Sequence, residues 1–125
     1  MSTPEGLVSR AIMDYLAARH IFSVRMNSGV TVAVTNGRRR AIHMNAPGTA
    51  DILAFPKIRK QDITAYGNIP GANLWYEVSV ILWIEVKSSA GKQSEFQKSF
   101  QQQVEREGHR YVLARSIEDV EAALK

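Results

Sequence analysis

The chain has 125 residues, with a hydrophobic fraction of 45% and a charged fraction of 22%, as expected for one soluble globular domain over residues 1–125. No apolar run reaches the roughly 18 residues of a membrane span, and the N-terminus has no basic region followed by an apolar stretch. The absence of cysteine excludes disulfides and zinc–thiolate sites. We therefore expect a cytoplasmic, intracellular protein.

The net charge is +4, and its distribution along the chain is uneven. Between positions 38 and 60 the only acid is Asp51, whereas the basic residues are Arg38, Arg39, Arg40, Lys57, Arg59 and Lys60. A charge run of this kind is often a solvated loop. The acid inside it favours a segment that binds phosphates, and such binding would weaken steeply between about 50 and 200 mM salt.

The first half of the chain predicts one helix followed by strands. Ser2 and Glu5 form a capping-box pattern, and a helical stripe of apolar residues runs from Leu7 to Leu16. Glu5 falls on the face of this helix that the sheet is expected to cover. Ile21 to Met26 reads as a strand, and residues 27–29 as a turn. Asn36-Gly37 between residues 30–35 and 39–44 is a strong hairpin signal. Residues 46–48 predict a turn, and residues 50–55 a strand.

The second half predicts a crossover unit. Residues 56–73 contain two prolines and two glycines without clear periodicity, which indicates a long loop. Strands are expected at residues 74–78, 80–87 and 110–114. Ser94 caps a helix to Glu107 that Gly108 ends, and Ser116 caps a last helix at 117–124. The fold class is therefore α/β, a mixed sheet flanked by helices, with parallel strands in the βαβ core.

Two carboxylates occupy positions at the ends of apolar segments. Asp51 opens Asp51-Ile52-Leu53-Ala54-Phe55, and Glu85 interrupts Ile81-Leu82-Trp83-Ile84-Glu85-Val86-Lys87. Lys87 shares a strand face with Glu85, because side chains alternate with period two. An unpaired buried acid costs several kcal/mol, so two such acids suggest a shared cation. A divalent ion with oxygen ligands and a nearby ammonium is the arrangement of a metal-dependent phosphodiesterase.

These residues, taken together, resemble the VRR-NUC domain of the PD-(D/E)xK nuclease superfamily, in particular its small stand-alone members of phages and bacteria. The resemblance runs from Glu5 through Asn27-Ser28-Gly29, Gly48-Thr49-Ala50-Asp51, Ile84-Glu85-Val86-Lys87-Ser88, Gly91-Lys92 and Gln97 to Tyr111-Val112-Leu113-Ala114-Arg115-Ser116. Glu-x-Lys alone is common, and its spacing to Gly91 and Gln97 adds the specificity. The family usually has proline where this chain has Ala50.

The resemblance implies a restriction-endonuclease-like fold and a role for each matched position. Asp51, Glu85 and the Val86 carbonyl would bind Mg²⁺ or Mn²⁺, with Glu5 as a further ligand. Lys87 would be catalytic, and Gln97 would position the lysine or the phosphate. DNA contacts are expected from Arg38, Arg39, Arg40, Ser88, Lys92 and Lys98. A phage-encoded member would act in the cytoplasm of its host.

The resemblance further implies a homodimeric endodeoxyribonuclease that resolves branched DNA such as four-way (Holliday) junctions. A nonspecific or flap-directed nuclease would use the same residues, and an RNA endonuclease is a further alternative. A non-catalytic nucleic-acid-binding module that keeps the fold is the alternative from another class. Purely structural roles would also explain these residues: a surface salt bridge for Glu85 and Lys87, a helix cap for Glu5, and core or interface positions for Trp75, Tyr76 and Trp83.

Overall fold

The computed structural model describes residues 3–26, 30–43, 46–62 and 74–125 as a mixed α/β fold with three helices around a four-stranded sheet. The strand order is β1-β4-β7-β8, formed by β1 (Ser23–Arg25), β4 (Ile52–Ala54), β7 (Leu82–Val86) and β8 (Arg110–Ala114). β1, β4 and β7 pair antiparallel, and β7 and β8 pair parallel. The expected mixed sheet with a parallel crossover unit is therefore confirmed.

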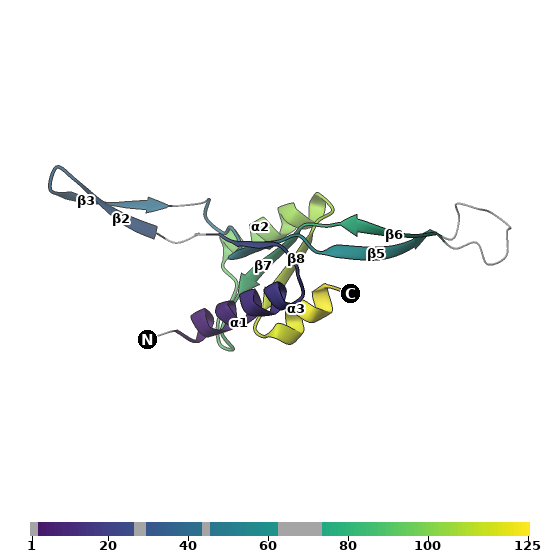
Figure 1. Ribbon diagram of the computed structural model, residues 1–125. Helices are drawn as coiled ribbons and strands as arrows, with labels where there is room; N and C mark the ends of the chain where they lie inside the picture. Colours follow the sequence, from purple (N-terminus) through teal and green to yellow (C-terminus); the bar gives the residue numbers. More distant parts are fainter. Residues whose placement is uncertain (1–2, 27–29, 44–45, 63–73) are drawn as a thin grey trace.

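Three helices cover the two faces of this sheet (Figure 1). α1 (Pro4–Ala18) and α3 (Ile117–Ala123) pack on one face, and α2 (Glu95–Arg106) packs on the other. The alternation along β7 assigns its side chains to these two layers. Ile84 faces α1 and α3, whereas Trp83 meets Phe100 of α2 edge-on, with ring centroids 5.0 Å apart.

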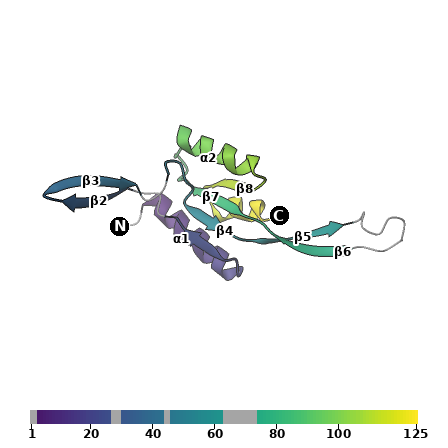
Figure 2. The ribbon, with the colours of Figure 1, turned by 90° about the horizontal axis from the view of Figure 1, so that it is seen from above.

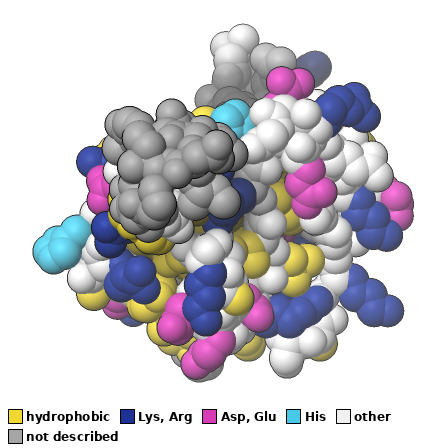
Figure 3. Space-filling model, turned by 90° about the vertical axis from the view of Figure 1, so that its right-hand side faces the viewer, with side chains coloured by type: hydrophobic (Ala, Val, Ile, Leu, Met, Phe, Trp, Pro, Cys, Tyr) yellow, Lys and Arg dark blue, Asp and Glu magenta, His cyan; other side chains and the backbone are white. Residues whose placement is uncertain are grey.

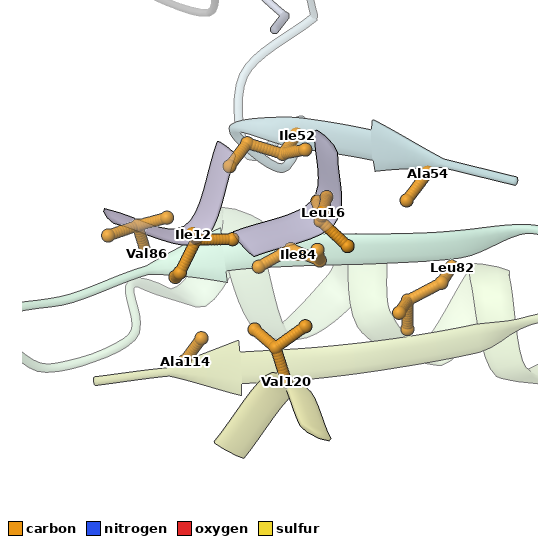
Figure 4. Packing of buried hydrophobic residues seen from close by; sticks show 9 residues of the cluster. All are labelled: Ile12, Leu16, Ile52, Ala54, Leu82, Ile84, Val86, Ala114 and Val120. Carbon is orange, nitrogen blue, oxygen red and sulfur yellow. The ribbon is translucent and has the colours of Figure 1, made fainter. Parts of the chain in front are cut away.

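The hydrophobic core lies between the sheet and the layer of α1 and α3 (Figure 4). Each residue of the cluster is buried, and each large side chain that is removed from water stabilises the fold by about 1.5–3 kcal/mol. The cluster consists of Ile12, Leu16, Ile52, Ala54, Leu82, Ile84, Val86, Ala114 and Val120. This packing fixes β7, which carries the predicted acid Glu85, and β4, which directly follows the predicted acid Asp51.

Two hairpins project from opposite ends of this core (Figures 1 and 2). The first consists of β2 (Val30–Thr35) and β3 (Arg38–His43), with Asn36 and Gly37 both at positive φ in the turn. It confirms the predicted Asn-Gly hairpin: positive φ at both central positions is the type I′ turn, which matches the twist of the flanking strands and favours Asn-Gly. The second consists of β5 (Lys57–Asp62) and β6 (Leu74–Ser79).

The β5–β6 hairpin corrects the prediction of a structureless loop over residues 56–73. Residues 57–62 pair with residues 74–79 in regular antiparallel register, and residues 63–73 lie outside the described part of the chain. The sequence Lys57-Ile58-Arg59-Lys60-Gln61-Asp62 has only one apolar residue, so its periodicity gave no strand signal. The pairing across the hairpin supplies the order that the local pattern does not specify.

The start of the first helix also differs from the prediction. Thr3 is the N-cap, its hydroxyl accepts a hydrogen bond from the Gly6 amide at 3.0 Å, and Pro4 takes the first helical position. Ser2 lies outside the described residues. Glu5 therefore does not occupy the capping-box position, and its side chain is exposed rather than covered by the sheet. Leu7, predicted on the apolar stripe, is also 56% exposed.

Other predicted boundaries are close to those of the structure. β8 has the predicted bounds, and α2 begins after the predicted cap Ser94 and ends before Gly108. The strands predicted at 21–26 and 50–55 are shorter, as β1 and β4, and the segment 74–87 divides into β6 and β7. Ser116 precedes α3 without a side-chain capping bond. The predicted turn at 27–29 lies outside the described residues.

We predict that Ile84→Ala lowers the free energy of unfolding by about 2–5 kcal/mol, because a fully buried side chain leaves a cavity when it is truncated. Val34→Ala is the matched control, since Val34 is 68% exposed on β2 and should cost less than about 1 kcal/mol. Urea unfolding measures both. Equal losses in the two variants would contradict the core described above.

Candidate active site

The two predicted acids lie on neighbouring strands of the central sheet. Glu85 is in β7, and Asp51 immediately precedes β4. Extending the register Ile52↔Ile84 by one position sets Asp51 opposite Glu85. Asp51 Oδ2 accepts a hydrogen bond of 2.8 Å from the amide of Val86. The aspartate side chain thus accepts the bond that a backbone carbonyl of a neighbouring strand would otherwise accept. The structure thus brings these acids together, although 34 positions separate them in the sequence.

Glu85 is the most constrained polar group of the site. Its side chain is 3% exposed, on the face of β7 that α2 covers. Oε1 accepts a hydrogen bond from Gln97 Nε2 at 2.7 Å, whereas Oε2 is buried with no hydrogen-bond partner among the described residues. Burial, followed by the nearby charge of Asp51, raises the pKa of Glu85 to about 8, against an opposing effect of Lys87. The carboxyl group is therefore short of compensating positive charge.

Lys87 approaches the same carboxylate from two positions further along the strand. Its Nζ lies 3.7 Å from Glu85 Oε1, and its side chain is 14% exposed. The backbone amide of Lys87 donates to the Ala114 carbonyl of β8 at 2.9 Å, which fixes the end of the strand. The same-face ion pair expected from the sequence is present, but it is enclosed and not a surface salt bridge.

Gln97 connects the first turn of α2 to the acids. Ser94 and Gln97 form a capping box, in which Gln97 Oε1 accepts from the Ser94 amide at 2.8 Å and the Gln97 amide donates to Ser94 Oγ at 3.1 Å. The other end of the side-chain amide, Nε2, is thereby oriented toward Glu85. Gln97 is therefore distinct from the other glutamines of the helix, and its predicted position beside the site is what the structure has.

Gly48 sets the distance between this helix and the strand that follows Asp51. Its φ is +88°, and a Cβ atom added there would lie 2.3 Å from the Phe96 carbonyl oxygen. Only glycine permits so close an approach of the two backbones. The sequence motif contained Gly48 without a role for it. Its position after Pro47 indicated a turn, but the contact with α2 has no local signal.

Arg115 is a second residue that the sequence did not single out. Its Nη1 donates to the carbonyls of Ser88 and Gly91, the latter at 2.8 Å, and so holds the loop that follows Lys87. An added Cβ at Gly91 would lie 3.2 Å from Lys87 Cδ, so this loop packs against the stem of the lysine. Arg115 therefore limits the directions that the Lys87 side chain can take.

Glu5 is near this group of residues but is not enclosed with it. Its charge makes the smallest of the contributions that raise the pKa of Glu85, and its side chain is exposed at the start of α1. Since Thr3 is the N-cap, the capping box predicted for Ser2 and Glu5 does not account for the acid at this position. A role as a metal ligand stays a prediction.

The predicted DNA-contacting residues fall into two regions. Ser88 and Lys92 lie in the loop after β7, where the Ser88 carbonyl is held by Arg115, and Lys98 lies on α2, where its Nζ is 3.2 Å from Glu95. Arg38 and Arg39 are exposed on β3 beside an open hollow with Thr35 and Asn36, and Arg40 follows in the same strand. Lysines and arginines are also spread over the face seen in Figure 3.

The donor atoms at the site fit a divalent cation. Asp51 and Glu85 present carboxylate oxygens, one of them buried and unpaired. The Val86 carbonyl points to the same side of β7 as its amide, toward Asp51. Magnesium commonly takes one or two carboxylates and keeps several waters. Within the described ranges, no group of three or more histidine, cysteine or acidic side chains is arranged around one point, so Glu5 does not complete such a cluster.

Comparisons of this chain with protein-family models, with curated proteins and with solved structures found no match. Any inference about function must therefore come from the geometry of the site and from the sequence motifs. A membrane-spanning helix of sufficient length and apolar character does not occur among the residues that the structure describes.

We predict that the metal-free protein loses stability as the pH rises from about 4.5 to about 8, by several kcal/mol in total. In this window Glu85 keeps its proton when folded and loses it when unfolded, so the folded state binds more protons and unfolding becomes easier with increasing pH. Glu85→Gln should abolish this part of the slope. Urea unfolding in chelator at several pH values measures it, and identical slopes in both proteins would disprove the assignment.

We also predict that Arg115→Ala and Arg110→Ala have different local effects despite similar chemistry. Arg110, at the other end of β8, donates from Nη1 to the carbonyls of Ala123 and Lys125, far along the strand from Lys87. Each variant should lose about 1–3 kcal/mol of stability. Only Arg115→Ala should accelerate amide hydrogen exchange at Gly91, whose amide donates to the Ser88 carbonyl. Unchanged exchange at Gly91 would show that Arg115 does not hold this loop.

Proposed function

We propose that this protein is a metal-dependent endodeoxyribonuclease with a restriction-endonuclease-like fold of the VRR-NUC type. One observation carries the proposal: Asp51, Lys87 and Gln97 converge on the buried carboxylate of Glu85, whose Oε2 has no partner within the described residues. A structural salt bridge does not require the second acid, which raises the cost of burying the first. A site that receives a cation explains why both acids are present.

Mg²⁺ or Mn²⁺ would be held by the carboxylates of Asp51 and Glu85 and by the Val86 carbonyl, with Glu5 as an additional direct or water-mediated ligand. When bound, a divalent ion supplies charge relief for phosphodiester hydrolysis and lowers the pKa of a coordinated water. The chain's own contribution is to hold the two carboxylates close together in a water-poor position, where a bound cation would replace the proton that folded Glu85 keeps up to about pH 8. Gln97 stabilises the Glu85 carboxylate in one orientation through its Nε2 hydrogen bond.

Lys87 is the proposed catalytic residue beside the ligands. Its ammonium group is a compact charge, close enough to Glu85 to be oriented by it and able to hold the attacking water or to offset charge on the scissile phosphate. The water would attack in line with the leaving 3′ oxygen, which leaves a 5′-phosphate and a 3′-hydroxyl. The Arg115 contacts keep the loop after Lys87 fixed while this occurs.

The β2–β3 hairpin and the loop after β7 are the proposed DNA contacts. β3 begins with Arg38, Arg39 and Arg40, and no acid occurs in residues 30–43. Such a projecting cationic strand suits a phosphate backbone. A homodimer acting on branched DNA, such as a four-way junction, rests on the family resemblance, together with the argument that two symmetric sites suit two symmetric cuts.

We predict that the protein cleaves DNA with Mg²⁺ or Mn²⁺ and not with chelator, and that Asp51→Asn and Lys87→Ala each lower the rate by at least about 100-fold. A panel of linear, flapped and four-way DNA substrates, with an RNA-containing substrate for comparison, measures rate and selectivity together. Binding of each substrate is measured in parallel in chelator, where retained affinity shows that the variants are folded and competent to bind.

Asp14→Asn is the matched control for Asp51→Asn, because Asp14 is an exposed acid on α1 and should leave the rate unchanged. Preference for four-way over linear DNA supports the junction-selective form of the proposal, whereas equal rates indicate a nonspecific nuclease. DNA binding without cleavage under every metal condition would reject the enzyme in favour of a non-catalytic module.

A further inference from the structure

The β5–β6 hairpin carries aromatic side chains that the core does not use. Trp75 and Tyr76 are 49% and 42% exposed on β6, so of the core or interface positions expected for them, the structure excludes the core. Trp83, in contrast, packs under α2 against Phe100 as expected. Two large aromatic side chains at consecutive positions of a projecting ribbon, one on each face, contribute nothing to the stability of the core, so their exposure needs another explanation.

Each face of this ribbon pairs one aromatic ring with one cation. On one face the Arg59 guanidinium carbon lies 4.6 Å from the centroid of the Trp75 ring, a diagonal contact across the two strands. On the other face Lys60 is directly opposite Tyr76 in the register. Arg59 faces Glu77 across the strands, and Lys57 adds a further exposed cation on the face of Arg59.

The ribbon is placed to meet something outside the fold. β5 and β6 form a separate two-stranded sheet, and Figures 1 and 2 show it extending away from the helices. Ile58, near its base, is the buried residue among those of the ribbon whose burial the structure describes. An apolar protein partner would gain nothing from the three cations of β5, and a second copy of this ribbon would bring like charges together. An anionic ligand with flat π-faces satisfies both the rings and the cations.

We propose that the β5–β6 hairpin binds unpaired nucleotides, whose bases stack on Trp75 and Tyr76 while Arg59, Lys60 and Lys57 contact the phosphates. Aromatic platforms combined with cations are the general chemistry of single-strand binding, and stacking tolerates any base. A regular duplex hides its base faces, so the ribbon selects strands that are open at a branch, gap or end.

This inference deepens the proposed nuclease function, since it names the substrate feature that would be presented to the site. The geometry supports that link because β5 follows β4 after Phe55 and Pro56, and β6 precedes β7 by two residues. β4 and β7 continue into the ribbon, and Asp51 and Glu85 lie at the opposite end of these two strands. A nucleic-acid strand held on the ribbon would run along β4 and β7 for roughly 20 Å, the length of the six residues from Ser79 to Glu85, before it reached the acids.

The test uses the full chain in chelator, with a short oligothymidylate as the unpaired probe and a blunt duplex as the comparison. Stacking of a base on Trp75 should quench its fluorescence, and the half-buried Trp83, packed against Phe100, supplies a constant background. Trp75→Ala should weaken oligothymidylate binding about 5- to 150-fold, as expected for the loss of one stacked base, and should change duplex binding far less.

Three variants make the result specific. Trp75→Phe keeps a stacking ring and should retain most of the affinity while it removes the fluorescence change. Arg59→Gln leaves Trp75 in place and should reduce the salt dependence of binding by about one unit of slope. Leu7→Ala is the control, because Leu7 is 56% exposed on α1, outside the ribbon, and should leave binding unaffected.

The outcomes separate this inference from the proposed function. If Trp75→Ala and Arg59→Gln bind oligothymidylate with unchanged affinity and still cleave DNA, nucleotide binding by the ribbon is rejected while the proposed nuclease function stands. If binding depends on Trp75 and Arg59 but no DNA is cleaved, nucleotide binding by the ribbon is supported and the proposed nuclease function is rejected. A fall in molecular mass from dimer to monomer in Trp75→Ala, measured by sedimentation, would identify the ribbon as a contact between copies and overturn the inference.

Discussion

The structure depends on one constraint, the burial of the Glu85 carboxyl group between the sheet and α2. An acid in this position is unfavourable unless its surroundings are arranged for it. Gln97 satisfies one oxygen, Lys87 supplies partial charge compensation, and Asp51 adds a second negative charge at close range. The remaining oxygen has no partner among the described residues. Every other feature of the site positions one of these groups.

The means of positioning are ordinary elements of secondary structure. A capping box orients Gln97, and Gly48 at positive φ allows α2 to approach the segment before β4. Where the pairing of β4 with β7 ends, the Val86 amide is free to donate to the Asp51 side chain. These local features act on different sequence segments, yet they converge within a few ångströms because the hydrophobic core fixes β4 and β7 in register. The packing of the opposite face of the sheet therefore determines the geometry of the polar face.

The sequence was sufficient for those parts of the fold that local signals determine. The Asn36-Gly37 turn, the Ser94 cap and the Gly108 stop each depend on a few adjacent residues, and the α/β class followed from the order of the elements. The convergence of Asp51 with Glu85 was also predictable, since an acid within an apolar segment needs a partner. Gly48 and Arg115 were not, because their contacts join segments that are distant in sequence. The predicted N-cap of α1 was wrong by one residue, because Thr3 and Ser2 are both suitable N-cap residues and the helix uses Thr3.

The insertion of the β5–β6 ribbon between β4 and β7 has a consequence for how this protein can vary. An antiparallel ribbon grows or shrinks by residues added in matched pairs, one on each strand, and such changes leave the pairing of β4 with β7 undisturbed. An unmatched single insertion would instead shift one strand and turn its side chains to the opposite face. The reach of the ribbon can therefore be altered in descendants of this chain while the two acids keep their relative position.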